Sequence, residues 1–321
     1  MKIKSIHPRE ILPDFSFCFM SEKGVYSESD LAGIEQAIKL SGIRTPLFVI
    51  QQPSGYQLLE GFKRYTIAQR LEMDSIPVQI VSHDSMPEAF YQVIVDQLAG
   101  AGFNLVQKSR ILSIASEWRG DHPDLYGDIL HLLEIPNHQE RMAQVLNILD
   151  FHPELKSYIE KYDLSLKQIQ PFFLLSQEEQ SLAAELGFSL QIRGVELIQI
   201  IEWAGDIAKR DDVTMPEVFD QIKIQKLYQD DTSRNDKINQ LKKRLLQIRY
   251  PKLTELNETF QDLHKQLNLP AQLKISWDKY YESQGLQLNG QIRNRRDFEA
   301  IRKFFADKNT GNIIEQMIES V

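Results

Sequence analysis

The chain has 321 residues, of which 42% are hydrophobic and 26% are charged, and its formal net charge is −8 at pH 7. This length is enough for two or three domains with cores of their own, and the composition excludes a largely disordered chain. Cys18 is the single cysteine, so an intramolecular disulfide and a cysteine-rich metal site are excluded. The acidic balance excludes a protein coated in positive potential, although local basic clusters still allow nucleic-acid binding.

The amino-terminal sequence predicts neither export nor membrane insertion. Residues 1–15 contain no apolar core of signal-peptide length, and apolar residues nowhere run on for the roughly 18 positions of a membrane span. A single cysteine also makes a reducing compartment the simplest setting. We therefore expect a cytoplasmic protein with no membrane partner.

Residues 47–71 hold the pattern on which the functional prediction depends. Two apolar runs, 47–50 and 56–59, flank a Gln-Pro-Ser-Gly turn and predict a β-hairpin. After Gly61 the apolar residues are spaced as on a helix. A strand is therefore expected to run through a glycine directly into a helix.

The start of this helix is a candidate anion site. A helix N-terminus presents unpaired backbone N–H groups and the positive end of the helix dipole, and a glycine lets a ligand approach the backbone closely. Lys63 and Arg64 add side-chain charge at the same place. The alternative is a glycine that only makes a sharp turn, followed by two solvated cations on an exposed helix face.

A polar pair ends the next predicted helix, 86–97. Asp96 offers a carboxylate to a hard cation, and Gln97 offers an amide. The alternative is a solvent-facing pair at the end of a helix. The glycine-rich stretch 100–102 then interrupts the helical pattern, and we place a domain boundary there.

Residues 104–205 have helical periodicity almost throughout and include a candidate helix-turn-helix. Two short helices, 126–133 and 139–149, flank a turn that contains Pro136. The second would be the recognition helix, whose exposed residues are of types that reach base edges and phosphates: Asn137, His138, Gln139, Arg141, Gln144 and Asn147. The alternative is two helices of an ordinary bundle, since Arg141 is the only cation of this helix and acidic residues surround it.

Four histidines of this region are not expected to bind a metal. Their spacing lacks the i, i+4 pair of a helical zinc site, and no cysteine assists them. We expect surface or packed side chains at these positions, which are His122, His131, His138 and His152.

Residues 206–236 are more polar than the helical part before them and are expected to link two domains. One short helix is predicted over 215–228. The acidic pairs on either side of it are expected to be solvated, because adjacent carboxylates point in different directions on a helix or strand.

The last part of the chain, 237–321, predicts helices with two strands between them. Its first helix is basic over an apolar stripe and includes Lys242, Lys243 and Arg244. With a second group of cations after residue 292, these side chains are suited to follow phosphates without reading sequence. The alternative is a solvated charged surface. The strands are expected at 273–277 and 285–292 and the final helix at 297–305.

Three short motifs occur in order along the first 100 residues: Gly-Ile-Arg-Thr-Pro-Leu at 42–47, Gly-Phe-Lys-Arg-Tyr-Thr-Ile-Ala at 61–68, and Asp-Gln-Leu-Ala-Gly at 96–100. They resemble the GI-x-x-P-L/I sequence, the Gly-Glu-Arg-Arg-x-Arg-Ala-Ala box and the Glu-Asn-x-x-Arg segment of the ParB family, whose amino-terminal domain shares its fold with sulfiredoxin-like proteins. The chain departs from the family pattern where Phe62 replaces the glutamate, Thr66 the third arginine and Gly100 the last arginine.

The resemblance implies an α+β fold in four parts. A ParB-like nucleotide-binding α/β domain is expected over 1–100, a helical domain with a helix-turn-helix over 104–205, a linker over 206–236 and a dimerisation module of helices and strands over 237–321. The implied cofactor is CTP with Mg²⁺. Its implied contacts are Gly42, Thr45, Gly61, Lys63 and Arg64 on the nucleotide, with Asp96 and Gln97 at the metal.

The function implied by the resemblance is a CTP-dependent dimeric clamp on DNA. Such a protein acts in chromosome or plasmid partition or in related transcriptional regulation, with a partition-type ATPase as a possible partner. The DNA contacts would come from the candidate recognition helix and the basic helix, which are Asn137, His138, Gln139, Arg141, Gln144, Lys242, Lys243 and Arg244. One alternative is an interaction scaffold that kept the fold and the dimer but lost nucleotide switching, and another is an enzyme that uses the same pocket on a different nucleotide.

Other chemistry of this fold finds no support in the residues. A sulfiredoxin-like activity needs a cysteine in the box, where this chain has Lys63, and Cys18 lies in a separate segment. GxSxG and Walker motifs do not occur, and no cluster of carboxylates and histidines is suited to two nuclease metals. We therefore expect at most a slow CTPase or NTPase.

Overall fold

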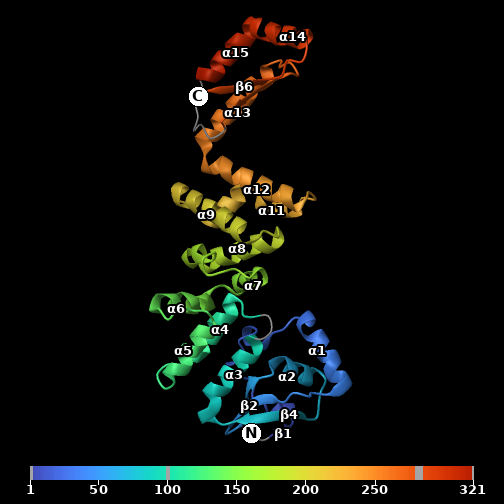
Figure 1. Cartoon of the computed structure of the whole chain (residues 1–321), viewed down its shortest axis with the longest axis vertical. Coiled ribbons are helices and arrows are strands. Elements are labelled where there is room, and N and C mark those ends of the chain that lie inside the picture. The colour runs from blue at the N-terminus through green and yellow to red at the C-terminus, as the bar shows by residue number, and fades with distance from the viewer. Residues whose placement is uncertain (1–2, 99–101, 279–284, 320–321) are drawn as a thin grey trace. The chain divides into compact units, whose positions relative to one another are not determined.

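The computed structural model describes residues 3–98, 102–278 and 285–319. The chain divides into two compact units, Met1–Ile198 and Gln199–Val321. The predicted α+β class is confirmed: a small sheet lies near the amino terminus, helices make up most of the chain, and a strand pair lies near the carboxy terminus (Figure 1). Among the described residues, every helix is too short or too polar to span a bilayer. The division into four parts stays a prediction.

A four-stranded sheet belongs to the first unit. Its strands are β1 (Ile3–Ile6), β2 (Leu47–Gln52), β3 (Gly55–Glu60) and β4 (Ile76–Val81), in the order β1-β4-β2-β3. β2 and β3 pair antiparallel with Gln52 opposite Gly55, so the predicted hairpin is confirmed. β4 pairs parallel with β2 and antiparallel with β1.

Three helices accompany this sheet, namely α1 (Glu28–Ser41), α2 (Phe62–Arg70) and α3 (Met86–Leu98). α1 begins at a capping box, in which the Ser27 hydroxyl accepts from the Asp30 N–H and the Asp30 carboxylate accepts from the Ser27 N–H. α2 begins one residue after β3 ends, which confirms the predicted change from strand to helix at Gly61.

Helices continue through the rest of the first unit. They are α4 (Leu105–Ser116), α5 (Pro123–Leu132), α6 (Gln139–Leu146), α7 (Pro153–Tyr162), α8 (Gln177–Ser189) and α9 (Gly194–Asp211), the last of which leads into the second unit. One apolar core extends from the sheet through α3 to α6. Phe90 of α3 meets Trp118 edge to face with 5.3 Å between ring centroids, and Phe17 stacks on the same indole. The sheet and these helices therefore fold around shared side chains.

The second unit is helical with one strand pair. It contains α10 (Met215–Gln221), α11 (Ile224–Gln229), α12 (Arg234–Arg249), α13 (Pro251–Gln266), β5 (Leu273–Trp277), β6 (Leu286–Gly290), α14 (Arg295–Ala306) and α15 (Lys308–Glu319). The single helix predicted over 215–228 is wrong, because Lys223 has a left-handed backbone (φ 56°) and separates α10 from α11. The two predicted strands and the helix that follows them are confirmed, and α15 was not predicted.

Candidate functional site

The start of α2 is shaped by Gly61. This residue has φ of 100°, in the left-handed region that side chains disfavour. A Cβ placed on it would lie 2.7 Å from Cγ of Leu47, a residue buried in the sheet. Position 61 therefore requires glycine. As the N-cap, Gly61 has no side chain to cap α2, so the N–H groups of the first turn of this helix are left for a ligand.

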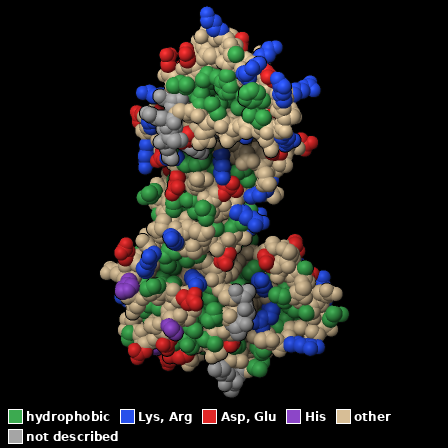
Figure 2. Space-filling view, turned by 45° about the horizontal axis from the view of Figure 1, so that its top comes forward, with side chains coloured by type: hydrophobic (Ala, Val, Ile, Leu, Met, Phe, Trp, Pro, Cys, Tyr) green, Lys and Arg blue, Asp and Glu red, His purple; other side chains and the backbone are tan. Residues whose placement is uncertain are grey.

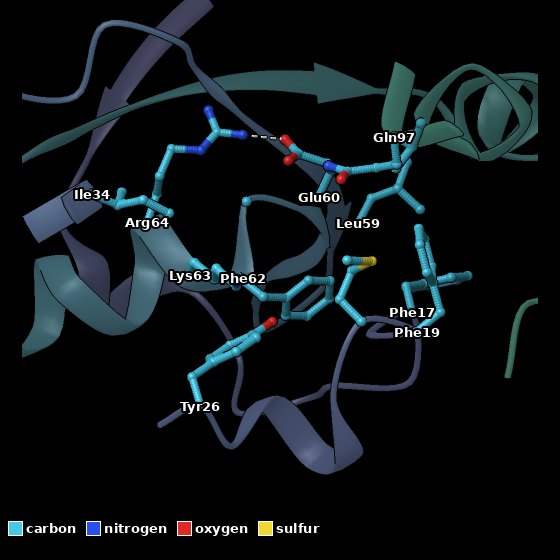
Figure 3. A pocket seen from close by; sticks show the side chains of 13 residues that line it. Phe17, Phe19, Tyr26, Ile34, Leu59, Glu60, Phe62, Lys63, Arg64 and Gln97 are labelled. Carbon is cyan, nitrogen blue, oxygen red and sulfur yellow. Dashed lines mark hydrogen bonds and ion pairs between the residues drawn. The ribbon is translucent and has the colours of Figure 1, made fainter. Parts of the chain in front are cut away.

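A cavity of about 350 Å³ lies against this helix start (Figure 3). Its wall combines apolar and aromatic side chains with the backbone of Gly61, and the residues are Phe17, Phe19, Met20, Tyr26, Ile34, Leu59, Glu60, Gly61, Phe62, Lys63, Arg64, Val93 and Gln97. The volume lies within the range of pockets that hold small molecules, which are usually apolar with a few converging polar groups. This cavity thus has the size and lining of a small-molecule site.

Lys63 is the cation that this cavity offers to a ligand. Its Nζ lies 5.3 Å from the centroid of the Tyr26 ring, which is within cation–π distance. Both side chains line the cavity. Among the described residues, no carboxylate lies within ion-pair distance of Lys63. The Tyr26 hydroxyl is 3.3 Å from Cys18 Sγ, and burial raises the pKa of this phenol well above its usual value, so Tyr26 stays neutral.

Arg64 makes its polar contacts with other residues of the chain. Its guanidinium forms an ion pair with Glu60 and donates hydrogen bonds to the backbone carbonyls of Thr45 and Pro46. These bonds tie the start of α2 to the segment that leads into β2. Arg64 therefore positions the wall of the cavity, whereas Lys63 faces the space within it.

The chain matches one known family over this region. Residues 3–95 match the family model described as the ParB N-terminal domain. This part of the chain resembles a ParB N-terminal domain. It contains the four-stranded sheet, α1, α2 and most of α3, so the cavity at the start of α2 lies mainly within it. The resemblance to the ParB family is thereby confirmed.

Solved ParB structures are also similar to the chain, at low identity. The C-terminally truncated chromosome-partitioning protein ParB from Caulobacter crescentus complexed with CTP-gamma-S is 15% identical, with 58% of this chain and 98% of that chain covered and a TM-score of 0.27. The same protein complexed to the centromeric parS site is 14% identical, with 62% and 98% covered and a TM-score of 0.31. The pNOB8-like ParB N-domain is 17% identical, with 62% and 86% covered and a TM-score of 0.37. These values are too low to assign a ligand or partner to this chain, and no curated protein matches it.

Two further residues of the predicted nucleotide set lie away from the cavity wall. Gly42 ends α1 with φ of 67°, and a Cβ placed on it would contact nothing within 4 Å. Thr45 is exposed and acts through its carbonyl, which accepts from Arg64. Both residues lie in the segment between α1 and β2, which Arg64 bonds at Thr45 and Pro46.

The predicted metal ligands are not brought together. Gln97 lines the cavity, but Asp96 lies exposed on α3, where its carboxylate accepts from the Gln92 amide at 2.8 Å. Within the described ranges, no group of three or more His, Cys, Asp or Glu side chains is placed to hold a metal ion. Asp96 by itself therefore does not make a magnesium site, and Gly100 lies outside the described residues.

The prediction missed the aromatic wall of the cavity. Phe17, Phe19 and Tyr26 come from the segment between β1 and α1, in which the structure has two short 3-10 turns and no α-helix or strand. The available signal was the recurrence of aromatic residues at positions 15, 17 and 19, around the only cysteine. Their alignment with Gly61 depends on long-range packing that periodicity does not reveal.

The candidate recognition helix is α6, which is shorter than predicted and ends at Leu146 before a 3-10 turn. The Tyr126 hydroxyl of α5 lies 3.4 Å from Met142 Sδ of α6 inside the common core, so the two helices pack on each other. On the outside, Arg141 donates to the Gln144 amide at 3.2 Å. Four predicted DNA contacts are exposed and Gln144 is half-buried; the exposed residues are Asn137, His138, Gln139 and Arg141.

The predicted DNA contacts on α12 differ in whether they bond to the protein or lie exposed. Arg244 donates to the Ile222 carbonyl at 2.8 Å and so closes the end of α10, which gives it a structural contact. Lys243 is exposed and Lys242 is half-buried. Among these three, Lys243 is the side chain best placed to meet a phosphate.

Proposed function

We propose that this chain is a ParB-like, nucleotide-dependent DNA-binding protein of the partition or related transcriptional type, and that the cavity at the start of α2 binds CTP. The observation that carries the proposal is the coincidence of two features in one segment. Residues 3–95 match the ParB N-terminal domain, and the box that begins at Gly61 forms the wall of a cavity of suitable size. The proposed setting is the cytoplasm.

The cavity wall supports distinct roles for its residues. The flat aromatic side chains of Phe17, Phe19 and Phe62 suit the base, because stacking on aromatic faces favours planar groups. The backbone N–H groups after Gly61 and the Lys63 ammonium suit the phosphates. Arg64 keeps the start of α2 in place. Mg²⁺ would be held by the phosphates and water, as this ion often is, since the described residues offer no carboxylate cage for it.

DNA binding is proposed for the exposed side of α6, with Lys243 as an additional phosphate contact. Asn137, Gln139 and Arg141 are exposed, polar and adjacent at the start of a short helix. Such side chains read base edges when a helix lies in the major groove. With few cations present, the electrostatic share of the affinity would be small and its salt dependence shallow.

Self-association is proposed for the carboxy-terminal part of the second unit. Four apolar side chains there are between 47% and 56% exposed: Leu288, Ile292, Phe298 and Phe305. In the upper part of Figure 2 apolar side chains gather on one face with Lys and Arg side chains around them. An exposed apolar patch with a charged rim is typical of a protein–protein interface. We propose that a second copy of the chain covers it and, following the resemblance, that a partition-type ATPase is a further partner.

A scaffold without nucleotide switching is the second candidate. It is favoured by two substitutions in the box, since Phe62 is buried in the wall and the Thr66 hydroxyl donates to the Phe62 carbonyl at 3.0 Å. Neither residue offers a charged group to a phosphate. On this proposal the dimer would bind partner proteins and the cavity would bind no nucleotide.

Calorimetric titration separates the two candidates. Purified protein is titrated with CTP, ATP, GTP and UTP in the presence of Mg²⁺, with and without duplex DNA. We expect selective binding of CTP and a gel shift of DNA that weakens as salt is added. Absence of binding for all four nucleotides at millimolar concentration would instead support the scaffold.

A further inference from the structure

A second cavity, of about 430 Å³, adjoins the first. The two share Met20, Tyr26 and Lys63 in their walls. On the far side of Lys63 the lining becomes mostly polar and charged. These residues come from the segment before α1, from α1, from α4 with its N-cap and from α7: Ser21, Glu22, Asp30, Asn104, Gln107, Arg110, Lys156, Ser157 and Glu160. The ammonium of Lys63 thus borders an apolar cavity and a charged one.

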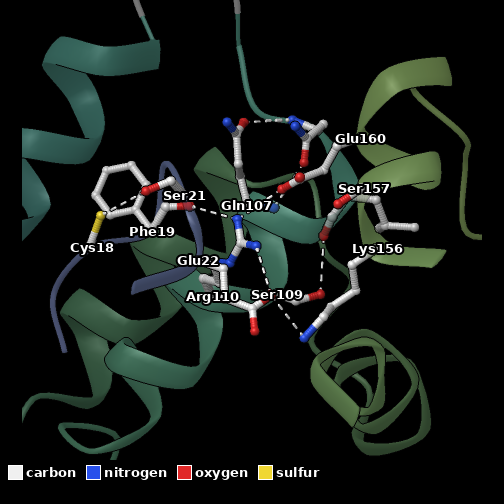
Figure 4. Close-up of polar contacts among 12 residues, drawn as sticks. Cys18, Phe19, Ser21, Glu22, Gln107, Ser109, Arg110, Lys156, Ser157 and Glu160 are labelled. Atoms are coloured by element: carbon white, nitrogen blue, oxygen red, sulfur yellow. Dashed lines mark hydrogen bonds and ion pairs between the residues drawn. The ribbon is translucent and has the colours of Figure 1, made fainter. Parts of the chain in front are cut away.

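Two cations are buried in the second cavity. The side chains of Arg110 and Lys156 are only 11% and 10% exposed, although they come from different helices. Arg110 pairs with Glu160 at 2.8 Å, and Lys156 donates to the Leu149 carbonyl at 3.1 Å. Figure 4 shows that both cations also approach Glu22.

Glu22 is the carboxylate that joins these cations to the amino-terminal segment. Its Oε2 lies 3.2 Å from Lys156 Nζ and 3.9 Å from Arg110 Nη2. Unlike its two partners, its side chain is 44% exposed and belongs to a short 3-10 turn, Glu22–Gly24. Among the described residues, Glu22 is the only carboxylate within 4 Å of Lys156.

The pairing is asymmetric in its energetics. Withdrawal of Glu22 into solvent costs this exposed carboxylate little, because water replaces its partners. Among the described residues, the same movement leaves the buried Lys156 with the Leu149 carbonyl as its one remaining partner, and an uncompensated buried cation is strongly unfavourable. Another anion is therefore required whenever Glu22 leaves.

We propose that Arg110 and Lys156 form a phosphate subsite for which the Glu22 carboxylate competes. This inference rests on the proposed nucleotide site: a nucleotide bound in the first cavity would extend its phosphate chain past Lys63 into the second. A polyphosphate carries several negative charges against the single charge of Glu22, and it suits the geometry of a guanidinium beside an ammonium. The subsite supplies positive charge where the box has Thr66 in place of an arginine.

The subsite also couples ligand binding to the packing of the first unit. The Arg110 guanidinium donates to the Phe19 carbonyl at 3.5 Å, and Glu22 bonds to Lys156, so the 19–22 segment is tied to both α4 and α7. A phosphate that replaces Glu22 removes the tie to α7. Binding of a nucleoside triphosphate would thus release the segment before α1 from α7.

The test uses full-length protein, two variants and one matched control, with inorganic tripolyphosphate and CTP as probes in calorimetry. Glu22→Gln removes the competing charge but keeps the shape, so we expect it to bind tripolyphosphate about tenfold more tightly than the parent chain. Lys156→Met replaces the buried cation by an apolar side chain of similar length and should weaken tripolyphosphate and CTP binding about tenfold. Lys161→Met, at an exposed position of the same helix, should change neither.

The outcomes separate this proposal from the proposed function. Unchanged tripolyphosphate affinity in Glu22→Gln overturns the subsite, whether or not the parent chain binds CTP. Tighter tripolyphosphate binding in Glu22→Gln supports the subsite even when CTP does not bind, in which case only the proposed function fails. Hydrogen exchange of residues 19–24 adds a local readout: exchange should rise with tripolyphosphate in the parent chain, and an unchanged rate would contradict displacement of Glu22. If Lys156→Met does not fold, Glu22→Gln alone decides.

Discussion

The starts of α2 and α6 are alike in sequence and different in structure. Each is a short helix with positive charge in its first turn, from Lys63 and Arg64 in α2 and from Arg141 in α6. At α2 the glycine conformation is fixed by packing on Leu47, Arg64 is bonded to the backbone before β2, and Lys63 lines a cavity. At α6 the first three side chains, Gln139, Glu140 and Arg141, are exposed. The first is shaped as an internal binding site, while any function of the second depends on a partner that approaches from solvent.

The largest effect is expected from a substitution of Gly61 at the start of α2. Gly61→Ala puts a side chain on a disfavoured backbone conformation and places its Cβ 2.7 Å from Leu47 Cγ. We expect this variant to lower the free energy of unfolding by about 2–4 kcal/mol. We also expect it to abolish nucleotide binding. Gly42→Ala is the matched control, since it has a similar φ but free space around its Cβ, and about 1 kcal/mol is expected. Equal losses in urea unfolding of the two variants would contradict the close approach at Gly61.

The two neighbouring cations of α2 should separate into structural and ligand roles. Arg64→Ala leaves Glu60 partly buried without its partner and should lower the free energy of unfolding by about 1–3 kcal/mol. Lys63→Ala should leave stability within about 0.5 kcal/mol and weaken CTP binding about tenfold or more. Urea unfolding and calorimetry on both variants measure these effects, with Lys39→Ala on α1 as a control for charge alone. Full CTP affinity in Lys63→Ala would remove Lys63 from the site.

At α6 a smaller effect is expected, confined to DNA. Arg141→Ala should reduce the slope of log affinity against log salt by about 1, as loss of one phosphate contact does. Nucleotide binding should stay the same, because α6 contributes no residue to the cavity at α2. Fluorescence anisotropy of labelled duplex DNA at several salt concentrations measures the slope. An unchanged slope would mean that Arg141 contacts no phosphate.

The smallest effect concerns the cap of α1, beside the cavity. Hydrogen bonds from Ser27 lower the pKa of Asp30, and the charge of Lys63 adds to this effect. Because the folded-state pKa is depressed, the stabilisation is present above the ordinary pKa of Asp and is lost as the pH falls through the lower folded value. The urea midpoint should therefore fall in strongly acidic solution, and Asp30→Asn should flatten part of that fall. An identical pH profile in the variant would exclude a contribution from this cap.

Local features were predictable from the sequence, and features made by long-range packing were not. The hairpin and the helix start at Gly61 follow from turn residues and a change of periodicity, and both are found. By contrast, Lys223 takes a left-handed conformation that nothing in its sequence requires, and it divides a predicted helix into two. The aromatic wall of the cavity likewise depends on a segment without periodicity.

The two cations of the box illustrate the same limit within the candidate site. Lys63 and Arg64 are indistinguishable as a basic pair in the sequence. Their difference comes from Glu60 and from the carbonyls of Thr45 and Pro46, which the sheet brings beside Arg64. For Asp96 the sequence did not show which face of α3 the residue occupies. In the structure the side chain is exposed, and its carboxylate accepts a hydrogen bond from Gln92.

Hydrogen exchange with and without CTP tests the central claim most directly, because it locates the ligand as well as detecting it. The account predicts slower exchange of the backbone amides after Gly61 on addition of CTP with Mg²⁺, and no such change in Lys63→Ala. Slower exchange only in other parts of the chain, or none at saturating CTP, would contradict the proposal that the start of α2 binds the nucleotide.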